Sequence, residues 1–251
     1  METYDQRIRI QKFIADQGIC SRRAAEGHIR NGNVVVNGQL AQLGDKIEPG
    51  KDFISLEGKR ITYRAPAKLT IALNKPKGFI CSNDDPHNDR TVFDLLPKEF
   101  ANQRLFCAGR LDKDSEGLVI LTNDGDLANK LMHPSSLVTK IYSVELKQLF
   151  PKEKIPKLLN GINYEGERLK VEQAVFLGNR NRPESKDLDV AMHHGKKREI
   201  RRLFSVLGFD VKRLKRYQIG RYNIKGIPKG AGLPLAPNDI EKLFQQPIEA
   251  L

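Results

Sequence analysis

The segment GRLDKDSEGLVILT, Gly109 to Thr122, sets a polar loop bracketed by two glycines directly before an uninterrupted apolar run. A short run of branched apolar residues after a glycine predicts a buried strand, here from Gly117 to Thr122. The loop then lies at the start of that strand. An aspartate in such a loop more often completes a turn or caps a helix than acts as a nucleophile, so position alone leaves both roles open for Asp112.

Outward from this segment, strand patterns outnumber helical patterns and do not alternate regularly with them. Strands are expected at Leu69 to Asn74, Phe79 to Ser82, Leu105 to Ala108, Gly117 to Thr122, Thr139 to Leu146, Arg168 to Phe176, Asp187 to His193 and Val211 to Leu214. Helices are expected at Gly125 to Met132, Lys152 to Leu159, Lys197 to Leu207 and Asn238 to Phe244. This mixture predicts an α+β domain on a mixed, mainly antiparallel sheet rather than a doubly wound nucleotide-binding fold.

The N-terminal part has a pattern of its own. Apolar residues at helical spacing, followed by Ser21 as a candidate cap, predict two short helices. Val34 to Val36 then precedes Asn37 and Gly38, a dipeptide that is typical of a tight β-hairpin. We therefore expect a small α+β module at residues 6–62, a linker at 63–68 and a larger α+β domain at 69–246.

The net charge of +12 is concentrated in one stretch of the chain. Between Gly195 and Gly230, twelve lysines or arginines face only Glu199 and Asp210, which leaves an excess of +10. A clustered basic surface attracts polyanions and gives salt-dependent affinity, whereas a purely solubilising excess has no reason to cluster. The charge favours nucleic-acid binding, with a solvated basic face as the alternative.

Several classes of protein are disfavoured by what the sequence contains. Cys20, Cys81 and Cys107 are odd in number and widely spaced, which fits neither a disulfide framework nor a zinc site. His193 and His194 are adjacent rather than a helical turn apart, so the usual metal-ligand spacing is missing. We see no secretory pattern and no apolar run long enough to span a bilayer. A cytoplasmic protein without a metal or membrane partner is expected.

Two arginines near the N-terminus break a rule of helix electrostatics. Arg22 and Arg23 follow Ser21 in the first turn of the second expected helix, where the helix dipole disfavours cations. This placement is reasonable if the arginines and the free backbone N–H groups together bind phosphate. The segments IQKFI at 10–14, GICSRRAA at 18–25 and GNVVVNG at 32–38 resemble the alpha-L RNA-binding module. The resemblance implies RNA binding through Lys12, Arg22 and Arg23.

The larger domain resembles RNA pseudouridine synthases of the RsuA and RluB type. The resemblance rests on four segments in the family's order: NKPKG at 74–78, TVFDLLP at 91–97, GRLDKDSEGLVILTN at 109–123 and GKKREIRR at 195–202. It is nearest to the RluB branch. It implies an isomerase without a cofactor, acting on ribosomal RNA or an assembly intermediate of the ribosome, as a monomer. Large-subunit RNA is the first expectation and small-subunit RNA the alternative.

The resemblance also assigns roles to individual residues. The aspartate of the Gly-Arg-Leu-Asp motif is the family's catalytic residue, which corresponds to Asp112. The family's active-site tyrosine corresponds to Tyr142, and its basic residue, expected to pair with the aspartate, corresponds to Arg201. Arg110 is expected to fill the space that the flipped-out uridine leaves, and Leu203 to belong to the substrate-binding set.

Helical geometry separates the arginines of the basic segment. The apolar residues Ile200, Leu203, Phe204 and Leu207 lie at i, i+3, i+4 and i+7 of the expected helix. At about 100° per residue, Arg201 lies at the edge of that stripe and is expected to be half-buried. The residues expected to face RNA phosphate or solvent are Lys196, Lys197, Arg198 and Arg202.

Two alternatives remain on sequence grounds. A non-enzymatic RNA-binding or ribosome-assembly factor would use the same basic surfaces and would not need Asp112. Another RNA-modifying enzyme, such as a methyltransferase, would need a glycine-rich loop for its nucleotide cofactor, and the segment KPKG at 75–78 lacks that spacing.

Overall fold

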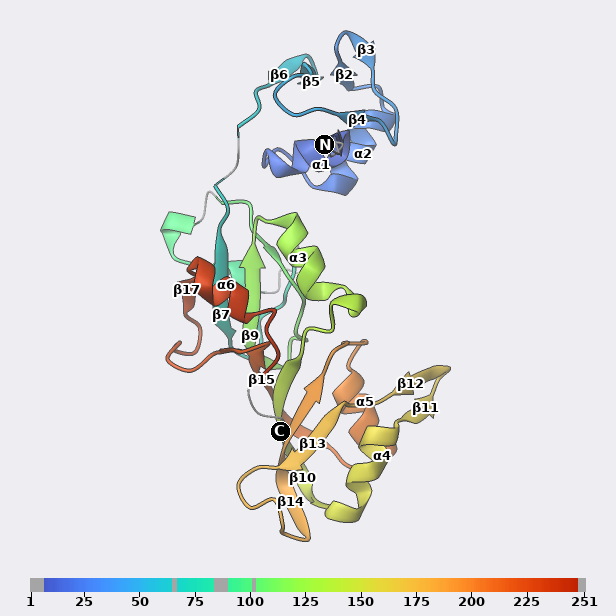
Figure 1. Ribbon diagram of the computed structural model, residues 1–251, viewed down its shortest axis with the longest axis vertical. Helices are drawn as coiled ribbons and strands as arrows, with labels where there is room; N and C mark the ends of the chain where they lie inside the picture. Colours follow the sequence, from blue (N-terminus) through green and yellow to red (C-terminus); the bar gives the residue numbers. More distant parts are fainter. Residues whose placement is uncertain (1–6, 65–66, 84–89, 101–102, 248–251) are drawn as a thin grey trace, which may run out of the picture. The chain divides into compact units, whose positions relative to one another are not determined.

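The computed structural model describes residues 7–64, 67–83, 90–100 and 103–247. The chain divides into two compact units, Met1–Lys68 and Leu69–Leu251 (Figure 1). Buried apolar clusters lie inside each unit, one in the first and two in the second. Residues 65–66 of the expected linker are outside the described part of the chain.

The first unit packs two helices beside short strands. Its elements are β1 (Ile8–Arg9), α1 (Ile10–Asp16), α2 (Arg22–Arg30), β2 (Val34–Val36), β3 (Gln39–Leu40), β4 (Lys46–Ile47), β5 (Ile54–Leu56) and β6 (Lys59–Ile61). The four strands β3-β2-β5-β6 form one sheet in that order, and β1 pairs with β4. Ser21 Oγ accepts a hydrogen bond from Ala24 N at 3.1 Å, which confirms the predicted cap of α2. Asn37 and Gly38 have φ of 49° and 85°, so the predicted hairpin between β2 and β3 is also confirmed.

The second unit contains the larger sheet. Its strands are β7 (Thr70–Lys75), β8 (Phe106–Cys107), β9 (Glu116–Thr122), β10 (Lys140–Pro151), β11 (Ile162–Tyr164), β12 (Glu167–Leu169), β13 (Gln173–Phe176), β14 (Glu184–Met192), β15 (Val211–Ile219), β16 (Tyr222–Asn223) and β17 (Gly232–Pro234). Its α-helices are α3 (Gly125–Met132), α4 (Ile155–Asn160), α5 (Glu199–Val206) and α6 (Pro237–Lys242). Short 3-10 helices are η1 (Val92–Leu95), η2 (Lys98–Phe100), η3 (Pro134–Ser136) and η4 (Lys152–Lys154).

The main sheet of this unit is mixed and mainly antiparallel, as the sequence predicts. Across the described residues its central order is β13-β14-β10-β15-β9-β7-β17, with β16 and β8 attached to β15 and β9. Neighbouring strands are antiparallel except β15 and β9, which are parallel. One row of paired residues crosses the centre of the sheet: Tyr142 on β10, Arg216 on β15, Gly117 on β9 and Lys75 on β7.

Helices cover both faces of the sheet. Leu158 of α4 and Leu203 of α5 belong to the same buried cluster as Val119 of β9. Leu131 of α3 belongs to the cluster on the opposite face, together with Leu118 of β9. In Figure 1, α4 and α5 lie beside β10 and β13, while α3 and α6 lie beside β9 and β7. Burial on both faces explains why β9 is a continuous apolar run in the sequence.

The structure departs from the predicted strands in four places. Strand β10 continues to Pro151 rather than ending at Leu146, because the chain bulges after Glu145 and pairs again with β14 at Phe150. Strand β15 continues to Ile219, since alternating basic residues hide its strand pattern. The strand expected at residues 79–82 is reduced to a single bridge at Ile80, and that expected at residues 168–176 divides into β12 and β13.

Candidate active site

The loop that carries Asp112 is held where β9 begins. Gly117, the second residue of β9, has φ of +110°, and a Cβ atom there would meet the carbonyl oxygen of Arg216 at 2.1 Å. Only glycine allows this close approach of β9 to β15. At the top of the loop, Ser115 N donates to the carbonyl oxygen of Asp112 at 3.0 Å and closes a tight turn. The close approach at Gly117 and the tight turn closed by Ser115 together fix the position of the Asp112 backbone.

Lys75, at the end of β7, holds this loop through hydrogen bonds to its backbone. It is fully buried at the end of β7, and its Nζ donates to the carbonyl oxygens of Ser115 at 2.7 Å, Asp112 at 3.0 Å and Pro76 at 3.2 Å. Burial lowers the pKa of Lys75 below its ordinary value, although nearby thiol and carboxyl groups act in the opposite direction. Gly78 N also donates to the carbonyl oxygen of Lys113 at 2.8 Å. The loop backbone is thus bound to β7 at several points.

A second carboxylate in the loop, Asp114, holds two arginines. Arg198 donates to both carboxylate oxygens of Asp114 at 3.0 Å each, and Arg201 Nε lies 3.2 Å from Asp114 Oδ2. Burial raises the pKa of Asp114, but the hydrogen bonds from Arg198 and the charges of both arginines outweigh it, so the pKa lies below its ordinary value. Bidentate arginine–carboxylate pairs are strong and fix orientation as well as distance.

This arrangement corrects one expectation. Arg201 is the most buried of the three arginines of α5 and its N-terminal flank, as predicted, with 12% of its side chain exposed. Its guanidinium nevertheless pairs with Asp114 rather than Asp112, and it also donates to the carbonyl oxygens of Asp114 and Val211. In the described chain, the guanidinium closest to Asp112 belongs to Arg198, whose Nη1 lies 4.0 Å from Asp112 Oδ2. The sequence placed Arg198 toward phosphate or solvent because helical angles do not show which carboxylate faces a helix.

Tyr142 lies on the row of residues at which β9 begins. It is 7% exposed. It lies on β10 and pairs with Arg216 of β15, which in turn pairs with Gly117 of β9. Two interstrand spacings of about 4.8 Å put the Tyr142 backbone roughly 10 Å from Gly117, the residue that ends the Asp112 loop. Tyr142 therefore belongs to the buried apolar cluster on this face of the sheet.

Arg216, which no sequence pattern singles out, is a buried cation in the same row. It is 2% exposed, and its Nε donates to the carbonyl oxygen of Leu118 at 2.8 Å. Its guanidinium carbon lies 6.0 Å from the centre of the Tyr142 ring, and its Nη2 has no hydrogen-bond partner within the described residues. Burial and the charge of Arg216 together lower the pKa of Lys140 to about 8. Arg216 and Lys75 are therefore two buried cations of the same row.

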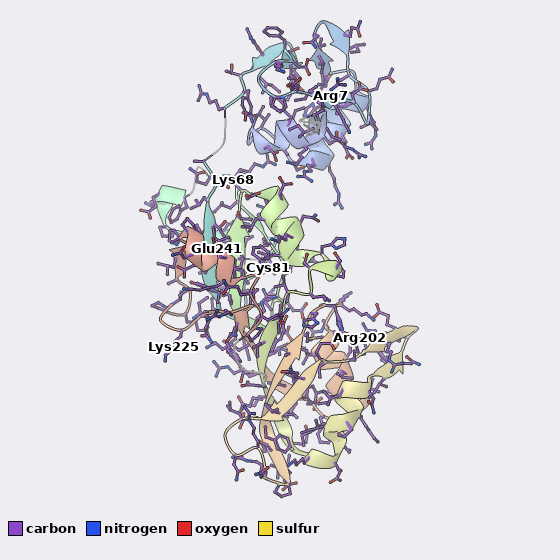
Figure 2. All side chains as sticks on the ribbon, viewed as in Figure 1. Arg7, Lys68, Cys81, Arg202, Lys225 and Glu241 are labelled. Atoms are coloured by element: carbon purple, nitrogen blue, oxygen red, sulfur yellow. The ribbon has the colours of Figure 1, made fainter. Side chains whose placement is uncertain are left out.

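Two of the remaining cations before and on α5, Arg202 and Lys196, have partners within the protein. Arg202 Nη1 lies 2.6 Å from Glu167 Oε2, and Figure 2 shows Arg202 beside the β11–β12 hairpin. Lys196 Nζ donates to the carbonyl oxygen of Arg168 at 2.6 Å. Lys197 is exposed. A buried acid, Glu199, organises the loop before α5 by accepting from Lys196 N at 2.9 Å.

The two residues predicted to bind substrate, Arg110 and Leu203, differ in their exposure to solvent. Arg110 is exposed at the start of the loop, where a side chain can reach a bound nucleic acid. Leu203 is fully buried among the apolar residues of the core and exposes no surface in this structure. Its helical phase in the stripe of α5 accounts for the burial.

The N-terminal candidates lie on the helices of the first unit. Arg22 and Arg23 are exposed at the first two positions of α2 and form no ion pair within the described residues. Lys12 Nζ lies 3.1 Å from Asp16 Oδ2, an i,i+4 pair on α1. No helix in the described part of the chain is both long and apolar enough to cross a membrane. No three histidine, cysteine or carboxylate side chains gather as a metal site in the same residues.

Comparison with known proteins gives the family. Residues 69–206 match the RNA pseudouridylate synthase family, and residues 8–53 match the S4 domain. Ribosomal large subunit pseudouridine synthase B of Bacillus subtilis (strain 168) is 36% identical over 236 residues, 94% of this chain and 95% of that protein. The chain belongs to the RNA pseudouridine synthase family. Both the resemblance and the isomerase class predicted from the sequence are confirmed.

Two further relatives support the assignment of this pseudouridine synthase. The dual-specificity RNA pseudouridine synthase RluF of Escherichia coli (strain K12) is 35% identical over 248 residues, 96% of this chain and 80% of that protein. A crystal structure of pseudouridylate synthase aligns with 94% of this chain and 99% of its own at 29% identity, with a TM-score of 0.66. The synthase fold and the enzyme class therefore exclude the two alternatives, a non-enzymatic RNA-binding factor and a methyltransferase.

The synthase site contains residues that sequence reasoning missed. Lys75 was part of a quoted motif, but only the structure shows its bonds to the Asp112 loop. Asp114 lies 84 residues from Arg198 and 87 from Arg201 along the chain, so no local pattern joins them. The signal that could have found Lys75 is a lysine ending an otherwise apolar strand, since a buried lysine needs several acceptors.

Proposed function

We propose that this pseudouridine synthase isomerises uridine in large-subunit ribosomal RNA. The observation that carries the proposal is the Bacillus subtilis relative, which is named for the large ribosomal subunit and aligns over nearly the full length of both chains. We also propose that the enzyme is a monomer, that it works in the cytoplasm and that it needs neither metal nor cofactor. The Escherichia coli relative is named as having dual specificity, so small-subunit ribosomal RNA remains the other candidate substrate.

In this proposal Asp112 is the catalytic residue. Isomerisation breaks the bond between uracil N1 and ribose C1′, rotates the uracil and joins C5 to C1′, while C5 loses its hydrogen as a proton and N1 gains a proton. A carboxylate can serve both the cleavage and the rejoining, by covalent attack or by stabilising a cationic sugar. The side chain of Asp112 is 38% exposed, which leaves it accessible to an everted nucleotide, while Lys75 and Gly117 hold its backbone.

The arginines and the tyrosine have supporting roles in the proposal. Arg198 places a positive charge 4.0 Å from Asp112, and Arg201 binds the same loop through Asp114 and Ser115. Tyr142 provides a ring against which the uracil stacks once the base is flipped out. Because only 7% of Tyr142 is exposed, the base reaches the ring after neighbouring side chains move.

RNA binding in the proposal uses both units. Arg110 lies at the start of the Asp112 loop, the exposed Lys197 lies just before α5, and Leu203 supports α5 from the core. Lys196, Arg198 and Arg202 contribute positive charge near phosphate, although each already has a partner in the protein. In the first unit the contacts are Lys12, Arg22 and Arg23.

Replacing the catalytic carboxylate tests the chemistry. We expect Asp112→Asn to lose pseudouridine formation by at least about 10³-fold, since the amide keeps the shape but removes the charge. The measurement is release of tritium from RNA labelled at C5 of uridine, in buffer containing a chelator. Asp187→Asn, an exposed aspartate on β14, is the matched control and should retain full activity. Product formation by folded Asp112→Asn at the wild-type rate would remove the assignment.

The RNA target is tested in cells. We expect ribosomal RNA from cells lacking this protein to lose pseudouridine at one or a few large-subunit positions, restored by the wild-type gene and not by Asp112→Asn. Loss only in small-subunit or transfer RNA would overturn the proposed target while leaving the enzyme class intact.

A further inference from the structure

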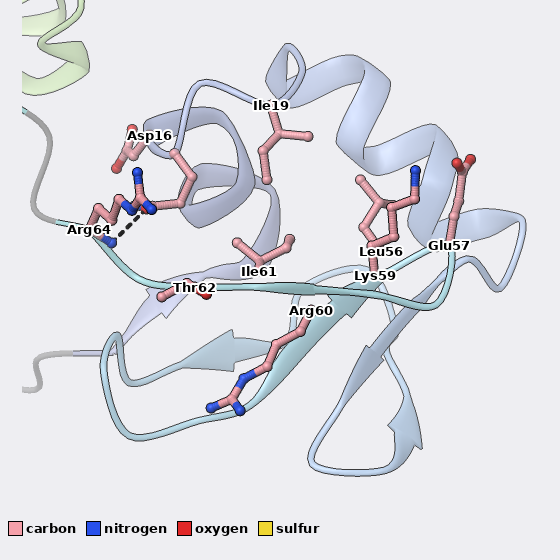
Figure 3. Close-up of a pocket in the computed structure, with 10 residues that line it drawn as sticks. Asp16, Ile19, Leu56, Glu57, Lys59, Arg60, Ile61, Thr62 and Arg64 are labelled. Carbon is pink, nitrogen blue, oxygen red and sulfur yellow. Dashed lines mark hydrogen bonds between the residues drawn. The ribbon is translucent and has the colours of Figure 1, made fainter.

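A hollow in the first unit lies beside the end of α1 (Figure 3). Its volume is about 610 Å³. The walls come from the end of α1, the connection to α2, the β5–β6 hairpin and the segment after β6. Most of the wall, residues 56–64, follows the segment 8–53 that matches the S4 domain. The hollow therefore extends beyond the matched segment.

The floor of the hollow is apolar and partly exposed. Ile19, Leu56 and Ile61 point toward one another in Figure 3, and 44% of Ile19 is exposed. An apolar floor of this kind can pack against the face of an unpaired nucleobase, which gains free energy when that face leaves water.

The rim carries unpaired positive charge. The two acids of the lining already have partners outside it: Asp16 lies 3.1 Å from Lys12, and Glu57 lies 3.3 Å from His28. Of the three cations of the lining, Arg60 lies over the ring of Phe53, with its guanidinium carbon 4.6 Å from the ring centre, whereas Lys59 and Arg64 form no ion pair within the described residues. Cations without carboxylate partners around an apolar floor favour a ligand that combines a flat base with a phosphate.

The wall also offers backbone hydrogen bonds. Strand β6 is at the edge of its sheet in the described chain, so the outer N–H and C=O groups of Lys59–Ile61 have no strand partner there. Gln17 Oε1 accepts from Arg64 N at 2.9 Å, which fixes the side-chain amide of Gln17 at the entrance. These groups can meet the polar edge of a base.

We propose that this hollow binds one unpaired nucleotide of the substrate RNA, with the base on Ile19, Leu56 and Ile61 and a phosphate on Lys59 or Arg64. The inference rests on the proposed function for the RNA itself. Ile19 is two residues before Ser21, the N-cap of α2, and α2 begins with Arg22 and Arg23, so the hollow and the phosphate contacts proposed for α2 are close along the chain. Charge favours RNA over a peptide strand added to β6.

The experiment measures binding of a fluorescent ten-nucleotide single-stranded RNA to the full chain. We expect Lys59→Glu and Ile19→Asp each to raise the Kd at least five-fold. Lys51→Glu, which makes the same charge change at a 73% exposed lysine outside the lining, should change it less than two-fold. Equal losses in Lys59→Glu and Lys51→Glu would mean general electrostatic attraction and would overturn the hollow as a site. Unchanged binding in all three variants would overturn it as well, and would leave a peptide as the occupant to test.

Crosslinking separates this inference from the proposed function. With 4-thiouridine in the RNA, irradiation should crosslink a base to the peptide spanning residues 56–64, and Ile19→Asp should abolish that crosslink. Crosslinks confined to residues 69–247 would contradict the hollow. Pseudouridine formation is measured on the same wild-type protein, so failure of the enzyme activity with an intact crosslink, or the reverse, identifies which of the two proposals is wrong.

Discussion

At the scale of single residues, Asp112 shares its loop with a second carboxylate that holds the nearby guanidinium groups. Asp114 binds Arg198 through two hydrogen bonds of 3.0 Å and lies 3.2 Å from Arg201 Nε. Two arginines without this carboxylate would repel each other and turn toward Asp112 or solvent. The position of positive charge around Asp112 therefore depends on Asp114.

We expect Asp114→Asn to lower the single-turnover rate at saturating enzyme at least ten-fold, because Arg198 and Arg201 lose their fixed orientation. RNA affinity should stay the same or increase, since the change removes one negative charge from an RNA-facing loop. Rate and affinity are measured separately, by product formation and by filter binding. Asp187→Asn serves as the control. A wild-type rate in folded Asp114→Asn would show that the arginine pair does not serve the reaction.

Lys140 gives the protein a pH dependence that can be isolated. Burial, with the charge of Arg216, lowers the pKa of Lys140 to about 8 from its ordinary 10.5. Between these values the unfolded chain holds a proton that the folded chain does not, so stability rises as pH increases from about 8 toward 10.5. The neutral amine still donates to the carbonyl oxygens of Val138 and His193.

We expect the free energy of unfolding of the wild type, relative to Lys140→Met, to increase by about 2 kcal/mol between pH 7.5 and pH 10. Urea unfolding of both proteins at the two pH values measures it. Other titrating groups are shared by the two proteins and cancel in the difference. A constant difference across this range would mean that Lys140 titrates near its ordinary value.

At the scale of elements, the start of β9 joins the loop to the sheet. Gly117 and Gly109 both have positive φ, +110° and +92°, yet only at Gly117 would a Cβ atom meet another chain segment, the Arg216 carbonyl oxygen at 2.1 Å. The two glycines bracket the same loop. Comparing them separates backbone strain from close approach.

We expect Gly109→Ala to cost about 1 kcal/mol of stability, the ordinary penalty of an L-residue in the left-handed region. Gly117→Ala should cost at least about 2 kcal/mol more and abolish activity, because β9 must move away from β15 and carry the Asp112 loop with it. Thermal unfolding and the tritium-release assay measure both. Equal effects of the two substitutions would contradict the close packing of β9 on β15.

The elements that sequence predicts well are those with a local cause. The apolar run of β9, the Ser21 cap of α2 and the apolar stripe of α5 are each determined by a pattern of a few neighbouring residues. Arg201 was placed at the edge of its helix for the same reason. The contents of the site could be predicted only from the resemblance to a family.

The parts that could not be predicted depend on contacts between distant segments. Helical angles place Arg198 and Arg201 on α5, but only the packing of α5 over the loop selects Asp114 as their partner. The full extent of β15 was hidden by its basic residues, which are matched by neighbours such as Glu145 and Glu116. Local sequence patterns do not predict pairings between residues that are far apart in the chain.

At the scale of the whole molecule, less of the excess positive charge is available to bind RNA than the sequence indicates. Within the stretch from Gly195 to Gly230, the cations that pair with carboxylates of the protein are Arg198, Arg201, Arg202, Lys212, Arg213 and Lys229. These pairs position α5 and β15 in addition to any role with RNA. Exposed cations without ion pairs, such as Arg22 and Arg23 in the first unit, are then the stronger candidates for releasing counterions from RNA.

We expect the double change Arg22→Ala and Arg23→Ala to weaken RNA binding and to reduce the slope of log K against log salt by about 1 to 2, because each lost phosphate contact removes roughly one counterion. The rate at saturating RNA should not change, since neither residue belongs to the unit that contains Asp112. The matched control removes two exposed cations of the second unit, Arg180→Ala and Lys186→Ala. An equal fall in slope for both pairs would show that total charge governs binding, and an unchanged slope for Arg22 and Arg23 would show that α2 does not contact RNA.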